Sequence, residues 1–152
     1  MRTPEERLTA LGLVLPDLAA PTDTYVPAKP AGQFLFLSGQ TPHRADGELA
    51  VGKLGVDVTL DEGYRHARLC ALQLIAAARA SVGDLSRLTV LKVFGMVNAD
   101  PGFKDHPKVI NGASDLFVEV FGEKGRHARS AVGMGSLPHQ VTVEVEAIFH
   151  VD

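Results

Sequence analysis

The sequence is poor in cysteine, the residue that crosslinks small secreted proteins, and it has no long apolar run. Its 152 residues include one cysteine, Cys70, which excludes an internal disulfide framework and fits a reducing compartment. No apolar stretch approaches the roughly 18 residues of a membrane-spanning helix. The first residues, MRTPEERLTALG, lack the apolar centre of a secretory signal. We therefore expect a cytoplasmic protein without a membrane partner.

A surplus of basic residues is also missing. Fifteen lysines and arginines stand against eighteen acidic residues, a net charge of −3. Proteins that bind polyanions usually carry a basic surplus, so the charge argues against a nucleic-acid partner. The chain is 45% hydrophobic and 22% charged, which is typical of globular proteins. Its length suits one domain, 1–152, whose core is stable without a metal or a disulfide.

The first 24 residues are expected to form a helix followed by a linker. Thr3 and Glu6 have the spacing of a capping box, Pro4 suits the first helical position, and Gly12 ends the apolar pattern. Four prolines between residues 13 and 32 disfavour regular structure there, apart from a short extended piece around 25–26.

Hydrophobic periodicity predicts an α+β fold for the rest of the chain. Helices are expected at 60–82, after a second capping box formed by Thr59 and Glu62, and from about 106 to 121. Strands are expected at 33–39, 48–54 (after the Asp46-Gly47 turn), 88–98, 127–136 and 140–151. Two helices cover only one face of such a sheet, and the segments 33–37 and 88–97 are apolar on both faces. We therefore expect the chain to form oligomers through its open sheet face.

Few residues form patterns typical of chemistry. The six histidines lack the spacing of a zinc site, so no metal site is predicted, and Cys70 lies among apolar helix residues that favour core packing. Glu144 and Glu146 share a face of the last strand, where a half-buried carboxylate would need a cation or several donors. Arg129, expected in the neighbouring strand, could be that ion-pair partner or could bind a substrate carboxylate through two hydrogen bonds. The spacing leaves both alternatives open.

Three motifs resemble the signature of the RidA family, also called YjgF or L-PSP. They are ARSAVGMGSLP, which contains Arg129, the following VEVEAI, and LSGQTP at 37–42. The resemblance extends from about Tyr25 to Val151. It implies a chorismate-mutase-like domain with a mixed sheet and two long helices on one face. It also implies a homotrimer with inward-facing sheets, and ligand sites in the clefts between subunits.

The resemblance further implies an activity that uses no cofactor. Family members hydrolyse reactive 2-imino acids or their enamine forms, such as 2-iminobutyrate and 2-aminoacrylate, to 2-keto acids and ammonia. Pyridoxal-phosphate enzymes release these substrates. The family's carboxylate-binding arginine corresponds to Arg129 and its water-positioning glutamate to Glu144. The other substrate-binding positions correspond to Tyr25, Ser38, Asn111 and Ala131.

Several departures are typical of a divergent branch. Ala131 replaces a cysteine that is frequent in deaminating members, and His127 replaces a common proline. The segment 122–128 resembles an insertion beside the cleft, where Arg126 or His127 would be additional ligands. Three alternatives to the deaminase are a non-catalytic trimer that binds a small carboxylate as a sensor or scaffold, an endoribonuclease, and a chorismate-mutase-like isomerase. The acidic net charge disfavours the endoribonuclease, and the isomerase would need more cationic groups than Arg129 alone.

Overall fold

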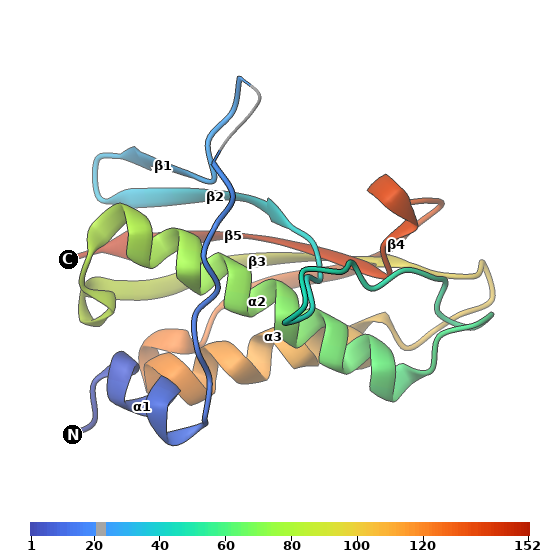
Figure 1. The fold of residues 1–152 in the computed structure, drawn as a ribbon, viewed down its shortest axis with the longest axis horizontal. Coiled ribbons are helices and arrows are strands. Elements are labelled where there is room, and N and C mark those ends of the chain that lie inside the picture. The colour runs from blue at the N-terminus through green and yellow to red at the C-terminus, as the bar shows by residue number, and fades with distance from the viewer. Residues whose placement is uncertain (21–23) are drawn as a thin grey trace.

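Two long helices lie side by side across one face of a five-stranded sheet in the computed structural model, which describes residues 1–20 and 24–152 (Figure 1). The helices are α2 (Leu60–Val82) and α3 (His106–Phe121). The strands are β1 (Ala28–Ala31), β2 (Phe34–Gln40), β3 (Leu88–Asn98), β4 (Ala128–Met134) and β5 (Val143–Val151). Their order in the sheet is β1-β2-β5-β3-β4, and only the β3–β4 pair is parallel. The α+β class and the mixed sheet with helices on one face are confirmed.

The helix boundaries follow the predicted capping residues closely. Helix α1 (Pro4–Ala10) begins with the complete Thr3–Glu6 capping box. Helix α2 begins after Thr59, whose side chain accepts a hydrogen bond from the Glu62 backbone N–H. The Glu62 carboxylate accepts from the Thr59 hydroxyl rather than from its backbone, so the second capping box is only half formed. Short 3₁₀ turns occur at η1 (Leu85–Arg87), η2 (Gly122–Gly125) and η3 (Pro138–Gln140).

The hydrophobic core fills the space between the helices and the sheet. The residues predicted to face inward are fully or almost fully buried, and they are Ala67, Ala71, Leu74, Ile75, Ala78, Ile110, Ala113, Phe117 and Val120. Phe149 of β5 meets Phe117 and Phe121 edge to face. Cys70 is fully buried in the same core, and burial raises the pKa of its thiol. The predicted packing role of Cys70 is confirmed.

The two long helices pack closely at Gly112. A Cβ atom at this position would overlap the backbone carbonyl oxygen of Tyr64 on α2. Hydrogen bonds from Tyr64 Oη to Asp115 Oδ2 at 2.7 Å and from Arg68 Nη2 to Glu119 Oε2 at 2.6 Å join the same two helices. The absence of a side chain at Gly112 therefore sets how closely α2 and α3 can pack.

Two strand predictions are wrong. Residues 48–54 form only isolated bridges to separate partners, among them Val51 with Val141 and Leu54 with Ala99. Gly52, at φ 130°, interrupts the extended conformation that a continuous strand needs. The extended piece expected around 25–26 lies instead at β1, where Gly32 at φ 58° makes a tight turn into β2.

The sheet order also corrects an expected neighbourhood. Arg129 and Glu144 were predicted to lie on neighbouring strands, but β3 separates β4 from β5. The return from β3 through α3 places β4 parallel to β3 at the sheet edge, and β5 then pairs with the free side of β3. The strands β4 and β5 therefore follow each other in the sequence but are not neighbours in the sheet.

Replacing Gly112 by alanine tests the helix contact. The overlap with the Tyr64 carbonyl outweighs the gain of about 1 kcal/mol that alanine brings to a helix interior, so we expect a net loss of about 2 kcal/mol. Urea denaturation at fixed protein concentration measures it. The control is Gly135→Ala, because nothing lies within 4 Å of a Cβ there. Equal stability of the two variants would contradict the close-contact interpretation.

Candidate active site

Arg129 lies on the edge strand β4 and reaches over α3. It pairs with Val93 of β3, whose side chain is buried on the helix-covered face. Arg129 Nη1 donates to Asn111 Oδ1 at 2.8 Å and to Ser114 Oγ at 3.1 Å, and Nη2 donates to the carbonyl oxygen of Pro107 at 3.4 Å. Two of the predicted site residues, Arg129 and Asn111, are therefore in direct contact.

His127 supports this arrangement from the start of the same strand. Its Nδ1 lies 2.6 Å from the Gly125 carbonyl oxygen and its Nε2 lies 2.9 Å from Ser114 Oγ. Because a carbonyl can only accept, Nδ1 carries the proton and Nε2 of the neutral ring accepts from the Ser114 hydroxyl. The Ser114 oxygen then remains available to accept from Arg129. Burial lowers the pKa of His127, the bond to Gly125 raises it, and the charge of Arg129 lowers it further, with burial the largest effect.

The segment 122–128 therefore supports Arg129 indirectly, through the contacts of His127 with Gly125 and Ser114. The 3₁₀ turn η2 supplies the Gly125 carbonyl, and a Cβ at Gly125 would overlap the α3 backbone at Phe117. Arg126 extends toward Glu123 at 3.9 Å, with most of its side chain exposed. In this subunit His127 is bonded to Ser114 and Arg126 extends toward Glu123, so neither has the position of the additional ligand that the sequence suggested.

The Nε side of the Arg129 guanidinium remains available for a ligand. Among the residues that the structure describes, Nε makes no hydrogen bond and Arg129 forms no ion pair. A guanidinium can bind a carboxylate through two parallel N–H donors. Ala131 lies two residues further along β4 on the same face and is partly buried against the core.

Glu144 lies on the other, open face of the sheet. It pairs with Met96 and is half-buried against Gly39, where a Cβ would overlap its carboxylate. Burial raises the pKa of Glu144, and the nearby Glu146 carboxylate raises it further. Within the described part of the chain no cation or hydrogen-bond donor is recorded for it. The predicted half-buried carboxylate is confirmed, whereas the ion pair with Arg129 is wrong because the two side chains leave opposite faces of the sheet.

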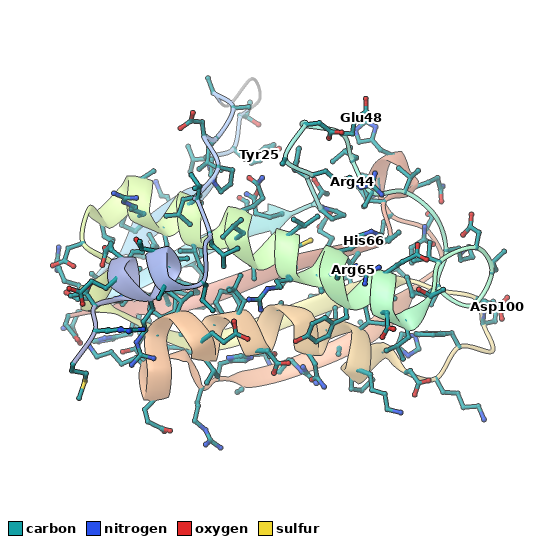
Figure 2. All side chains as sticks on the ribbon, turned by 60° about the horizontal axis from the view of Figure 1, so that its bottom comes forward. Tyr25, Arg44, Glu48, Arg65, His66 and Asp100 are labelled. Atoms are coloured by element: carbon teal, nitrogen blue, oxygen red, sulfur yellow. The ribbon has the colours of Figure 1, made fainter. Side chains whose placement is uncertain are left out.

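Ser38 ties the Tyr25 segment to the sheet. Ser38 Oγ donates to the Val26 carbonyl oxygen at 2.6 Å, and its backbone N–H donates to the carbonyl of Pro27 at 2.9 Å. Tyr25, directly before, is 62% exposed, and Figure 2 shows it beyond the β1 side of the sheet, away from α3. Ser38 therefore holds a loop that presents an exposed aromatic ring.

The open face of the sheet has a shallow hollow of about 570 Å³, which is lined by residues of β1, β2, β3 and β5. Phe36, Phe94 and Ile148 form its apolar floor, while Lys29, Lys92, Glu146 and Ser38 add polar groups. Phe36 is 44% exposed, and its strand segment is one of the two predicted to be apolar on both faces. The exposed apolar face is confirmed; the assembly that would cover it stays a prediction.

The predicted site residues thus fall into two groups in one subunit. Arg129, Asn111 and Ala131 lie at the β4–α3 edge, while Tyr25, Ser38 and Glu144 lie toward β1, β2 and β5. Sequence reasoning missed Ser114 and the role of His127. The spacing of Ser114 three residues after Asn111, on the same helix face, was the available signal.

The described residues contain neither a cluster of metal ligands nor a membrane-spanning helix. No group of three or more His, Cys, Asp or Glu side chains is placed to hold a metal ion in residues 1–20 and 24–152. In the same part of the chain, no helix combines the length and the apolarity that crossing a membrane would require.

Comparison with known proteins identifies the family. A family profile described as "YjgF/chorismate_mutase-like, putative endoribonuclease" matches residues 5–147. The chain belongs to this family, which is the RidA family. Protein TCP17 of Trypanosoma cruzi is 46% identical over 143 residues, which are 93% of this chain and 89% of that protein.

Two solved structures resemble the whole chain. The protein Atu1372 of Agrobacterium tumefaciens, described as of unknown function, is 44% identical with a TM-score of 0.90, covering 99% of this chain and 92% of that one. A "putative endoribonuclease" from Shewanella oneidensis MR-1 is 39% identical with a TM-score of 0.94, covering 99% and 100%. A RidA from Psychrobacter sp. PAMC 21119, at 24% identity, shares the fold with a TM-score of 0.60 over 87% of this chain and 92% of its own. The first two structures cover nearly the whole chain, including its N-terminal region.

The Glu144 environment predicts a pH-dependent stability. A raised pKa means that the folded chain retains a proton that the unfolded chain has already released. Glu144 therefore destabilises the fold increasingly as pH rises from 4.5 through its folded-state pKa. We expect Glu144→Gln to stabilise the protein more at pH 8 than at pH 4 in urea denaturation. The control is Glu123→Gln, at a side chain that is 90% exposed, and an equal pH trend in both variants would contradict the interpretation.

The Arg129–His127 arrangement predicts a measurable shift in the His127 pKa. Arg129→Gln removes a nearby positive charge and should raise the pKa of His127 toward 6.5, while burial keeps it below that value. Proton NMR titration of the imidazole ring measures this shift. His66 serves as the internal control, because the charges that act on it are those of Arg44, Glu62 and Arg65. A His127 pKa that stays unchanged would show that Arg129 does not face it.

Proposed function

We propose that this protein is a hydrolytic deaminase of small 2-imino acids and their enamine forms, with 2-keto acid and ammonia as products. The observation that carries the proposal is the held guanidinium of Arg129. Asn111 and Ser114 orient it through the 2.8 and 3.1 Å bonds, and its Nε side is unengaged by the described residues. Such a group can bind a substrate carboxylate through two parallel, charge-assisted hydrogen bonds.

Arg129 would fix the substrate without sharing its charge with a protein carboxylate. Preset hydrogen bonds to Asn111 and Ser114 mean that little side-chain freedom is lost when the substrate binds. The imine carbon would then be held at one position relative to the protein, which supplies much of the advantage of an enzyme over free solution. Ala131, with its small side chain on the same strand face, would leave room for the substrate beside Arg129.

Glu144 would supply the proton transfer. Its raised pKa brings it closer to neutral pH, where a carboxyl group can both accept a proton from the attacking water and return it to the departing ammonia. The oxygen of that water forms a bond to the imine carbon, and cleavage of the carbon–nitrogen bond then releases ammonia. The residues present can perform this hydrolysis without a cofactor.

A complete site would require more than one copy of the chain. Arg129 and Glu144 leave opposite faces of one sheet, so one subunit does not join them. The family resemblance implies a homotrimer with sites in its subunit clefts. The exposed hollow lined by Phe36, Phe94 and Ile148 supports such an assembly. In it, the Tyr25–Ser38–Glu144 group of one subunit would face the Arg129–Asn111 group of the next, and Tyr25 would close the pocket.

A coupled assay tests the activity. A threonine or serine dehydratase generates 2-iminobutyrate or 2-aminoacrylate in situ, and keto acid release is followed with and without this protein. We expect wild type to accelerate release. Arg129→Ala should lower kcat/KM roughly 100-fold, because a charged two-bond contact is lost. Glu144→Gln should lower kcat with little change in KM, because glutamine cannot exchange a proton.

The matched control is Arg126→Ala, which removes an exposed arginine three residues before Arg129. It should retain wild-type rates. Rates equal to the uncatalysed reaction with wild-type protein would overturn the deaminase for these substrates. Saturable binding of the keto acid without turnover would instead favour the non-catalytic sensor or scaffold, and RNA cleavage would favour the endoribonuclease.

A further inference from the structure

A second pocket lies on the helix-covered side of the molecule, away from Arg129. It has a volume of about 360 Å³, within the range typical of small-molecule sites. Its walls come from four parts of the chain: the N-terminal segment at Leu13, the loop at Arg44, the helix α2 and the helix α3 at Leu116. Nothing in the proposed deaminase reaction uses this pocket.

The apolar wall of the pocket is formed by leucines. Leu69 and Leu72 of α2 lie beside Leu13 and Leu116, and three of these four are only partly buried. Partly exposed leucines in a concavity gain free energy when an apolar ligand group covers them. This wall favours a ligand with a hydrocarbon or aromatic body.

The polar wall is positively charged. The side chains of Arg44, Arg65 and Arg68 line the pocket, and no acidic side chain does. Arg68 is neutralised by Glu119 at 2.6 Å. Within the described residues Arg44 and Arg65 form no ion pair, and the Glu62 carboxylate on the same helix accepts from the Thr59 hydroxyl instead. Arg44 Nη1 donates to the Leu49 carbonyl oxygen at 3.4 Å. The other N–H groups of Arg44 and those of Arg65 are available to one anion.

His66 lies between these two arginines (Figure 2) and lines the same pocket. It is 8% exposed, and its Nδ1 lies 2.9 Å from Thr142 Oγ1. When the Thr142 hydroxyl donates to Nδ1, the proton resides on Nε2, for which no partner is recorded among the described residues. Burial lowers the pKa of His66, and the charges of Arg44 and Arg65 lower it further against the opposing charge of Glu62. The charges of both guanidinium groups therefore act on His66, which lines the pocket.

We propose that this pocket is a second ligand site, for a small organic anion whose carboxylate meets Arg44, Arg65 and His66 while its apolar body covers the leucines. The charged groups and the leucine wall together favour a ligand that has both an anionic group and an apolar body. An inorganic anion would leave the leucines exposed, and a neutral apolar molecule would leave two guanidinium groups without a partner. The site occupies a different part of the fold from the Arg129 group, so both can be filled in one subunit.

Octanoate, acetate and octylammonium are the probes that separate the two contributions. In isothermal titration of the full chain we expect saturable octanoate binding. Acetate should bind at least tenfold more weakly, because its body is too short to cover the leucines. Octylammonium has the same body with the opposite charge and should not bind. Octylammonium binding as tight as octanoate binding, or no saturable octanoate binding, would overturn the proposal.

Variants locate the site. The double variant Arg44→Gln/Arg65→Gln should weaken octanoate binding at least tenfold. The control is Arg79→Gln, which removes an exposed arginine of the same helix outside this pocket, and it should retain wild-type affinity. Amide NMR shifts on titration should lie near residue 44 and along 65–72. Shifts confined to the open sheet face, or equal affinity of the double variant, would overturn the assignment.

The test is independent of the proposed deaminase. Arg129→Ala should retain octanoate affinity while it loses turnover. Failure of turnover in every variant would leave the octanoate result intact, and failure of octanoate binding would leave the deaminase assay intact. Loss of octanoate binding in Arg129→Ala alone would place the ligand at Arg129 and overturn the second site.

Discussion

Two helices can cover only one face of a five-stranded sheet, and the rest of this structure depends on that constraint. Helices α2 and α3 bury one face of all the central strands, and the close contact at Gly112 fixes their spacing. The opposite face remains open, with Phe34 and Phe36 more than 40% exposed. An apolar face of this kind is stable only when something covers it. The proposed homotrimer, the hollow on the open face and the division of the site residues into two groups all follow from this one-sided architecture.

The position of Arg129 illustrates how such a sheet can prepare a binding group. An edge strand leaves one side of its backbone and its side chains near solvent, so a charged residue there avoids the cost of full burial. The neighbouring helix then supplies acceptors at fixed positions, here the side chains of Asn111 and Ser114. His127 sets the orientation of Ser114 because the Gly125 carbonyl fixes its tautomer. In this subunit the segment 122–128 thus acts on the candidate site through hydrogen bonds.

Glu144 has the opposite character. It is half-buried on the open face beside a second carboxylate, an arrangement that costs stability in the isolated subunit. Unfavourable ionisation of this kind is frequent where a carboxyl group exchanges protons near neutral pH. Across the molecule, Arg44, Arg65 and His66 form a region of positive potential above an apolar wall.

The sequence by itself determined the local structure and the family. Helix α2 begins after the predicted capping residue Thr59, and α3 has the predicted bounds, because capping and amphipathic periodicity act over a few residues. Three motifs, two of which contain Arg129 and Glu144, indicated the RidA family. Only the tertiary structure decided that β3 separates these residues, that 48–54 forms bridges instead of a strand, and that Ser114 and His127 hold Arg129. Pairing between strands depends on contacts between residues far apart in the chain, and local propensity carries no information about which strands become neighbours.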